Sequence, residues 1–243
     1  MLFDVIPAID VSDGGLARLA AGRATPIDAY EGDPVAAADA FLLGGARWLH
    51  VVDLDLALTG SPANLQTISL LAVMDARVQA SGGIATEAHV EAVLGAGAQR
   101  AVLGSAALAD RSLTERLVQR YGDAVAVAIE VSGETIRPRG PATAELPLDE
   151  TLDWLRESGA TRYVHVAVDR VGGMGGPDVD GVSHVAFRTQ RPVIVSGGIG
   201  KRGDVAAVAS LGPLVQGVVV GRSLYEGELT VRDAITAAAG AGA

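Results

Sequence analysis

The chain has 243 residues, of which 49% are hydrophobic and 20% charged, with a formal net charge of −10. This length suits one large domain or two small ones, and the acidic balance argues against a nucleic-acid partner, which needs a basic footprint. The absence of cysteine excludes disulfides and thiolate chemistry. No apolar run is long enough to span a bilayer, and the first residues lack the pattern of a signal peptide. We therefore expect a cytoplasmic protein with no membrane partner.

Short apolar runs alternate with helical patterns from one end of the chain to the other. The expected strands cover residues 2–9, 48–53, 78–80, 100–103, 125–129, 162–168, 192–195 and 217–220. The expected helices cover residues 34–43, 64–74, 87–94, 113–121, 148–157, 182–188, a segment starting near 201, and 232–239. The strands are nearly continuous runs of Val, Ile, Leu and Ala, which is typical of parallel strands buried on both faces.

Three segments break this alternation. They are a polar, glycine-rich loop at 13–33, an insert at 132–147 and a glycine-dense loop at 172–177. Eight strand–helix units of this total length predict a single (β/α)8 TIM barrel spanning residues 1–243. A doubly wound open sheet is the alternative architecture. No Gly, Ser or Pro linker divides the chain.

The strand ends are paired half a chain apart. The pairs are Asp10 with Glu130, His50 with His165, Ser81 with Ser196, and Gly104 with Gly221. Such a repeat predicts a barrel built from two similar halves. It would place Asp10 and Glu130 across from one another at the strand ends, where the catalytic groups of such barrels lie.

The paired strand ends are rich in glycine. Two apolar runs end in Ser-Gly-Gly before a helical pattern, and the next apolar run in each half ends in glycine; the residues are Ser81, Gly82, Gly83, Gly104 and Ser105, then Ser196, Gly197, Gly198, Gly221 and Arg222. Glycine lets the backbone approach a phosphate closely, and a helix N-terminus attracts an anion. Arg222 could add a charge-assisted contact. The pattern predicts two phosphate sites, with plain strand-to-helix turns as the alternative.

Carboxylates also stand at strand ends. Asp10 and Glu130 would point into the barrel mouth, where partial burial can tune a carboxyl as an acid or a base. A helix cap or loop contact is the alternative for both. Asp53 and Asp169 each end a strand and could either serve catalysis or orient loops.

Basic residues are expected around the ligand. Arg137 and Arg139 lie in the insert and could form a basic flap over an anionic substrate, or a solvated hairpin. The same two interpretations apply to Arg18. The four histidines are scattered without ligand-like spacing, so we expect no metal site, and aromatic residues, at 4%, are too few for a base-stacking platform.

Assembled, these motifs resemble the histidine-pathway phosphoribosyl isomerase family. The matching stretches are 6–10, Arg18–Leu19, 32–34, 50–55, Asn64, 81–84, 104–108, 175–177, 196–199 and 220–225. The family's usual substrate is ProFAR, a bisphosphorylated aminoimidazole-carboxamide ribonucleotide. The sister cyclase family usually has Cys just before the first-strand aspartate, where Ile9 stands here.

The resemblance implies an Amadori rearrangement of an aminoaldose to an aminoketose, with no cofactor. It implies that Asp10 is the general base, and that the glycine turns, Gly176, Arg18 and Arg139 bind the phosphorylated substrate. The insert containing Arg139 and Gly140 is most similar to the actinobacterial branch, whose members also isomerise phosphoribosyl anthranilate. We expect a monomer whose partner is a small phosphorylated ribosyl substrate.

Several positions depart from the family pattern. Val171 stands where the family has its general acid, and Asp169, two residues earlier, would face the same side if this segment were extended. Glu130 replaces an aspartate, Ala85 replaces an arginine, and Pro141 replaces a tryptophan of the dual-substrate branch. Loss of an acid typically costs about 10²–10⁴ in rate.

Two alternatives to ProFAR isomerisation stay open. One is isomerisation of phosphoribosyl anthranilate, alone or as a second activity; Arg139 favours it and Pro141 opposes it. The other is a relic that binds bisphosphates without converting them, since Val171 stands at the position where the family has its general acid.

Overall fold

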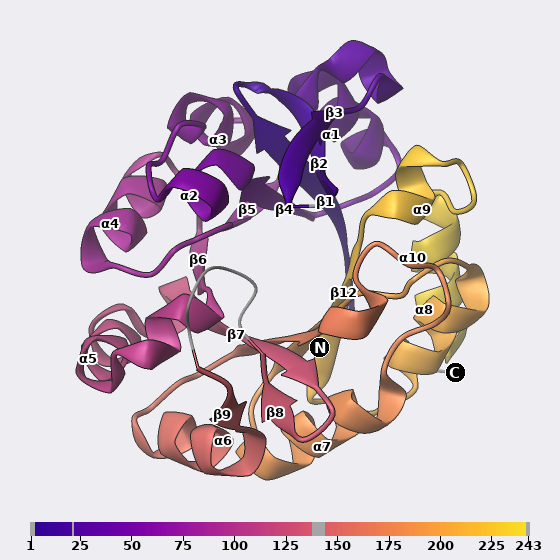
Figure 1. Cartoon of the computed structure of the whole chain (residues 1–243). Helices are drawn as coiled ribbons and strands as arrows, with labels where there is room; N and C mark the ends of the chain where they lie inside the picture. Colours follow the sequence, from indigo (N-terminus) through magenta and orange to yellow (C-terminus); the bar gives the residue numbers. More distant parts are fainter. Residues whose placement is uncertain (1–2, 21, 138–143, 242–243) are drawn as a thin grey trace.

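In the computed structural model, which describes residues 3–241 except 21 and 138–143, parallel strands close into a barrel surrounded by helices (Figure 1). In ring order the strands are β1 (Asp4–Ser12), β4 (Trp48–Asp53), β5 (Arg77–Ser81), β6 (Arg100–Leu103), β7 (Val125–Ser132), β10 (Tyr163–Ala167), β11 (Val193–Ser196) and β12 (Val215–Val220). Pairing of β1 with β12 and of β7 with β10 closes the ladder. The predicted (β/α)8 barrel is confirmed, and the open-sheet alternative is wrong.

The helices cover the outside of the barrel. They are α1 (Pro34–Leu43), α3 (Leu65–Ala72), α4 (Glu87–Gly95), α5 (Arg111–Tyr121), α6 (Leu148–Glu157), α7 (Val179–Thr189), α8 (Arg202–Ala209) and α10 (Val231–Ala241). Local sequence sets where they begin: the Asp33 carboxylate accepts a hydrogen bond from the Val35 backbone N–H, and Pro34 occupies the first turn. Within the described ranges, no helix is long and apolar enough to cross a membrane.

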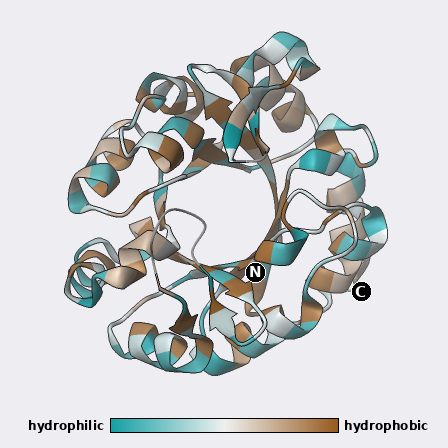
Figure 2. Cartoon of the chain, viewed as in Figure 1, coloured by the Kyte–Doolittle hydropathy of each residue, from teal (hydrophilic) through white to brown (hydrophobic). Residues whose placement is uncertain are grey.

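Two hydrophobic layers hold the barrel together. The larger layer lies between the strands and the helices, and the smaller one fills the barrel interior with side chains from alternate strand positions: Ile6, Trp48, Val102, Ala126, Ala128, Val164, Val166, Ile194 and Val219. Figure 2 shows the strands mostly brown and the outward helix faces largely teal. The interior is therefore packed below the mouth, as in other barrels of this class.

The expected loop at 13–33 is wrong in part, because it contains a hairpin of β2 (Gly15–Ala20) and β3 (Arg23–Pro26). The chain reverses from β1 into β2 through Asp13 and Gly14, whose φ angles are 50° and 76°. An Asp-Gly pair with positive φ at both residues favours a tight hairpin turn. The hairpin stands over the barrel mouth and carries Arg18.

Other departures from the sequence prediction are short. Helix α2 (Leu54–Thr59) and the four-residue α9 (Arg222–Tyr225) follow β4 and β12 directly, where no helix was expected. The insert begins with β8 (Thr135–Ile136) and ends with β9 (Leu146–Pro147), which pair antiparallel. Arg139 and Pro141 lie outside the described residues.

The predicted half-barrel repeat places its glycines and carboxylates correctly. In ring order β5 stands opposite β11, β6 opposite β12 and β1 opposite β7. The pairing of His50 with His165 is wrong by one residue. His50 lines the cavity inside the mouth, whereas Val164 and Val166 belong to the interior layer. His165 lies on the outer side of β10, 3.5 Å from Asp178 at the start of α7, because a shift of one residue turns a strand side chain to the other face.

Asp53 orients loops, as one of its two sequence interpretations proposed. Its buried carboxylate accepts hydrogen bonds from the backbone N–H groups of Leu56, Ala63 and Asn64 at 2.9, 3.2 and 3.2 Å, and from the Asn64 side chain at 2.6 Å. Asp53 thereby caps α2 and ties β4 to the start of α3.

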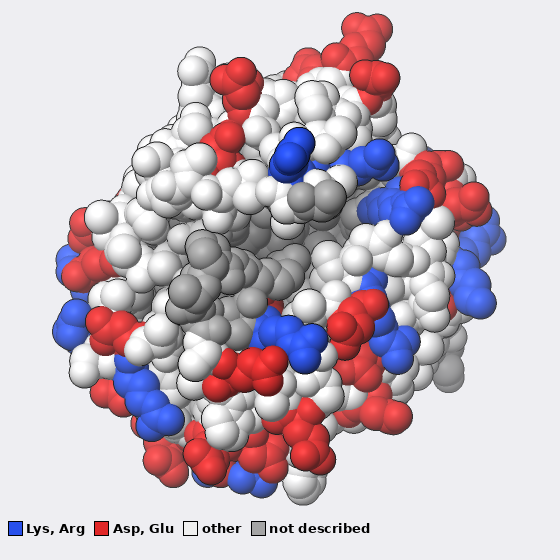
Figure 3. Space-filling view, viewed as in Figure 1, with Lys and Arg blue, Asp and Glu red and all other residues white. Residues whose placement is uncertain are grey.

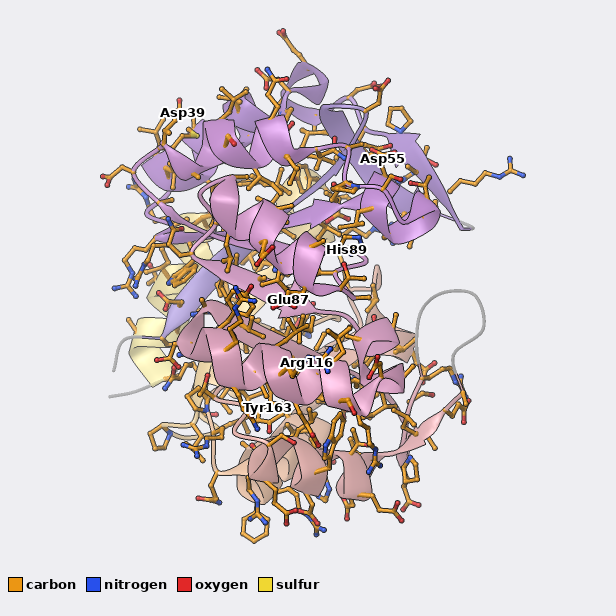
Figure 4. All side chains as sticks on the ribbon, turned by 90° about the vertical axis from the view of Figure 1, so that its left-hand side faces the viewer. Asp39, Asp55, Glu87, His89, Arg116 and Tyr163 are labelled. Atoms are coloured by element: carbon orange, nitrogen blue, oxygen red, sulfur yellow. The ribbon has the colours of Figure 1, made fainter. Side chains whose placement is uncertain are left out.

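Replacing Asp53 with alanine should lower the free energy of unfolding by roughly 2–4 kcal/mol, because several buried donors lose their partner. Urea unfolding checks this. The matched control is Asp39→Ala on the exposed face of α1, which should change stability by no more than about 0.5 kcal/mol. In the side view of Figure 4, Asp39 lies toward the other end of the barrel from Asp55, the neighbour of the capping network. Equal losses in both variants would contradict this assignment.

His165 should make stability depend on pH. Burial lowers the pKa of His165 from 6.5 to about 4, against the opposing effect of the Asp178 carboxylate. As the pH falls from 6.5 toward 4, the unfolded chain gains a proton that the folded chain does not, so the free energy of unfolding should fall by up to roughly 3 kcal/mol. His165→Gln should remove this part of the slope, whereas His184→Gln, at an exposed position, should retain it. Identical slopes in both variants would refute the interpretation.

Candidate active site

A cavity of about 1110 Å³ opens at the carboxyl ends of the barrel strands. Its lining includes residues from the ends of β1, β4, β5, β7 and β11, and from the segments after β6 and β12. Figure 3 looks into this face, which is hollowed at its centre, and several lysine or arginine side chains stand around the hollow. Arg18 and Arg222 line the cavity. The site therefore offers local positive charge within an acidic protein.

The turn after β5, residues 81–83, forms one wall and is called the first-half turn. Ser81, Gly82 and Gly83 line the cavity, and the two glycines have φ angles of 95° and 68°. A Cβ on Gly83 would stand 2.7 Å from the carbonyl oxygen of Leu56. Only glycine fits this left-handed, crowded backbone, which presents main-chain groups to the cavity.

The turn after β11, residues 196–198, repeats this geometry on the opposite wall and is called the second-half turn. Gly197 and Gly198 have φ angles of 100° and 84°, and a Cβ on Gly198 would overlap the backbone of Gly176. The Gly176 N–H donates to the Gly198 carbonyl oxygen at 2.9 Å. The Arg170 guanidinium donates to the Gly176 carbonyl oxygen at 3.0 Å. Gly176 therefore supports this turn from behind, and its N–H is already committed.

A second glycine completes each half. Gly104 and Gly221 follow β6 and β12, line the cavity, and each precedes a short helical segment, residues Ser105–Ala109 and α9 respectively. The Gly104 N–H donates to the carbonyl oxygen of Ile84 at 3.0 Å. The side chain of Ser105 lies outside the described part of the structure.

Arg222 is half-exposed and engaged on two sides. Its Nε donates to the Glu226 carboxylate at 2.5 Å, and its Nη1 donates to the carbonyl oxygen of Gly172 at 2.8 Å. An ion pair this exposed contributes little to stability. Its stronger effect is to hold the glycine-dense loop beside the second-half turn.

Asp10 and Glu130 both line the cavity, and their strands β1 and β7 stand on opposite sides of the ring. The predicted placement across the mouth is confirmed. Glu130 is 6% exposed. Near Asp10, the Tyr225 hydroxyl donates to the carbonyl oxygen of Ala8 at 2.8 Å, and burial, reinforced by the charge of Asp10, raises the pKa of Tyr225. Two carboxyl groups facing one cavity form an arrangement suited to acid–base chemistry.

Residues 4–230 match a family model described as "Histidine biosynthesis protein". The chain belongs to this family. A relative in Salinispora tropica is 40% identical over 237 residues, covering 97% of this chain and 98% of the relative. One in Saccharopolyspora erythraea is 40% identical over 243 residues, covering 98% and 99%. Both are named 1-(5-phosphoribosyl)-5-((5-phosphoribosylamino)methylideneamino) imidazole-4-carboxamide isomerase. A third, in Streptomyces coelicolor, is named phosphoribosyl isomerase A and is 38% identical over 236 residues, covering 96% and 98%.

The placement predicted for Asp169 is wrong. Residues Val168–Arg170 form a 3₁₀ turn rather than an extended segment, so Asp169 does not face the same side as Val171. Val171 lines the mouth cavity, whereas Asp169 lines a neighbouring cavity of about 710 Å³ and accepts a hydrogen bond from Ser132 Oγ at 2.9 Å. Whether Asp169 takes part in catalysis stays a prediction.

The site also contains two histidines that the sequence analysis did not assign to it. His50 and His89 line the cavity, and His50 contacts Ser81 Oγ through Nε2 at 3.0 Å. His89 lies near Ala85, whose backbone N–H approaches its Nδ1 at 3.4 Å. The inward position of His50 could have been found from strand alternation, since Trp48 two residues earlier belongs to the interior layer. Among the described residues, no group of three or more His, Cys, Asp or Glu is arranged to hold a metal ion.

The second-half turn should depend on glycine at position 198. Gly198→Ala should lower the free energy of unfolding by more than about 2 kcal/mol, because the new methyl group would be strained at positive φ and overlap the Gly176 backbone. Thermal or urea unfolding measures the loss. In the control Gly203→Ala, on α8 with open space around the new Cβ, stability should rise by about 0.5–1 kcal/mol. A neutral Gly198→Ala would contradict this account of the turn.

Proposed function

We propose that this chain isomerises ProFAR, converting its aminoaldose to an aminoketose in histidine biosynthesis. The observation that carries the proposal is the position of Asp10 and Glu130 on opposite strands of one cavity, between two matching glycine turns. The names of the relatives agree with this reaction. The activity is that of an aldose–ketose isomerase, an intramolecular oxidoreductase.

Each half of the site would hold one phosphate of the substrate. The first-half turn with Gly104, and the second-half turn with Gly221 and Arg222, face each other across the mouth. Backbone N–H groups and short helical N-termini bind phosphate without a dedicated charge. Arg18, on the hairpin over the mouth, would add charge to the same ligand. A substrate with a phosphate at each end would span the cavity and be fixed at both ends.

The chemistry between the phosphates needs one acid and one base. The acid protonates the ring oxygen of the ribose, the C1′–oxygen bond breaks, and the nitrogen lone pair forms an imine at C1′. The base then removes the C2′ proton, and the resulting enolamine tautomerises to the aminoketose. Ring oxygen and C2′ both adjoin C1′, so two carboxyl groups on opposite walls suit the two transfers.

Asp10 is assigned as the base, as the resemblance to the family implies. Glu130 is assigned as the acid, because it lines the cavity that Asp10 lines, and Val171 occupies the family's acid position. Asp169 is the rival for the acid and would need the loop that carries it to rearrange, since it lines the neighbouring cavity.

The proposal includes a cytoplasmic monomer as the active form. One chain supplies both glycine turns and both carboxyl groups of the proposed site, so the site as proposed needs no residue from a partner subunit. Sedimentation of the active protein at assay concentration tests this, and a dimer would refute it.

The direct test is an assay of the purified protein on ProFAR and on phosphoribosyl anthranilate, with no added cofactor. Conversion of ProFAR is the expected result. Conversion of phosphoribosyl anthranilate alone would favour that substrate instead. Calorimetric binding of ProFAR without measurable conversion would instead identify a non-catalytic relic.

Three substitutions should separate the roles of the carboxyl groups. Asp10→Asn should abolish conversion, and Glu130→Gln should lower kcat by about 10²–10⁴, the usual contribution of a general acid. Asp169→Asn should stay within about threefold of the parent protein, because its loss leaves the mouth cavity intact. Steady-state kinetics measure all three, with folding checked by circular dichroism. A large loss in Asp169→Asn with Glu130→Gln unimpaired would transfer the acid role to Asp169.

A further inference from the structure

A line of hydrogen-bonded polar side chains runs through the barrel to the first-half turn. Arg100 Nη1 donates to Gln79 Oε1 at 2.8 Å, Gln79 Nε2 contacts His50 Nδ1 at 2.7 Å, and His50 Nε2 contacts Ser81 Oγ at 3.0 Å. Gln79 is fully buried and His50 is 8% exposed. Ser81 and His50 line the cavity, so the line connects the interior with the site.

Arg100 sets the direction of the first hydrogen bond. A guanidinium only donates, so the oxygen of the Gln79 amide must face it. Arg100 is buried, with its guanidinium 4.3 Å from the ring centroid of Trp48. Burial, and then the charge of Arg162, lower the pKa of Arg100 to about 10, so it stays cationic at neutral pH. The orientation of the Gln79 amide is therefore fixed by chemistry.

That orientation in turn fixes where the imidazole carries its hydrogen. The Gln79 NH₂ group only donates, so Nδ1 of His50 must be the bare, accepting nitrogen. A neutral imidazole then carries its hydrogen on Nε2 and donates it to Ser81 Oγ. A second ring hydrogen would have to sit on Nδ1 and face the amide hydrogens of Gln79.

We propose that Gln79 is a positioning residue that holds His50 in the Nε2-protonated form, so that Ser81 directs its own hydroxyl hydrogen at a phosphate on the first-half turn. A hydroxyl that already accepts from His50 is left to donate elsewhere. Ala85, an uncharged side chain, lines this wall of the cavity. The inference rests on the proposed function in one respect, namely that a phosphate occupies this turn.

The first test reads the tautomer directly. Nitrogen NMR of protein labelled with ¹⁵N-histidine distinguishes a bare from a protonated ring nitrogen. In the parent protein His50 should carry hydrogen on Nε2 and none on Nδ1. In Gln79→Glu, a carboxylate of the same shape accepts from Arg100 and from His50 alike, so hydrogen should appear on Nδ1. A parent protein with hydrogen on Nδ1, or a variant with Nδ1 still bare, would overturn the proposal.

The second test measures the consequence for the ligand. Inorganic phosphate is titrated while the backbone amide signals of Gly83 and Gly198 are followed, so the two turns report separately. The comparison is made at a pH where the spectra show one ring hydrogen on His50 of the variant. There, Gln79→Glu should lower the affinity for phosphate at the first-half turn about tenfold, which is the effect of one hydrogen bond to a charged group. The affinity for phosphate at the second-half turn should change by less than about twofold. There, strand β11 carries Ile194 two residues before Ser196, at the position that corresponds to Gln79.

A matched variant identifies the path. Ser81→Ala should lower the affinity for phosphate at the first-half turn as much as Gln79→Glu does. The double variant should lose little more affinity than either single variant. Additive losses, or unchanged affinity in Gln79→Glu, would overturn the role of Gln79. If phosphate shifts neither the Gly83 nor the Gly198 amide signal in the parent protein, the proposed function is overturned. The part of this inference that concerns phosphate binding is then overturned with it. The tautomer is decided separately by the first test.

Discussion

Closure of the parallel ladder is the constraint on which the rest of this molecule depends. Pairing of β1 with β12 and of β6 with β7 joins the two halves, and the closed ring brings every barrel strand's carboxyl end to one mouth. Because β1 and β7 then stand opposite each other, two carboxyl groups far apart in sequence share one cavity. The same closure sets the two glycine turns on facing walls, so a ligand with two anionic ends meets the same backbone geometry at each end.

The two walls reach that geometry by different means. The second-half turn is backed by Gly176 and flanked by Arg222, which anchors the glycine-dense loop through the carbonyl oxygen of Gly172. The first-half turn packs against the end of β4 and the start of α2, which Asp53 caps, and Ser81 is in hydrogen-bond contact with His50. One half therefore relies on a cation at the rim, and the other on oriented polar groups supplied from the interior. Fixed dipoles of this kind act without reorganising when the ligand arrives.

The sequence predicted the barrel well, because buried parallel strands are continuous apolar runs and helix starts carry Asp-Pro or Thr caps. It also placed Asp10, Glu130 and the paired glycines on the mouth. It missed the hairpin after β1, because the glycine and polar residues of this segment are also typical of a loop, although Asp13-Gly14 is a hairpin signal. It misplaced Asp169 because a 3₁₀ turn cannot be distinguished from an extended segment by spacing alone. The contact between Gln79 and His50 joins neighbouring strands and depends on register, which local patterns do not encode.

The central claim is that one bisphosphorylated ligand spans the mouth, with a phosphate on each glycine turn and its reacting carbons between Asp10 and Glu130. A crystal structure of the Asp10→Asn variant with ProFAR bound tests this most directly, because the substrate should remain unconverted. The account predicts one phosphate within hydrogen-bond distance of the backbone N–H groups around Gly83 and the other around Gly198. A substrate bound with both phosphates away from these turns would contradict it.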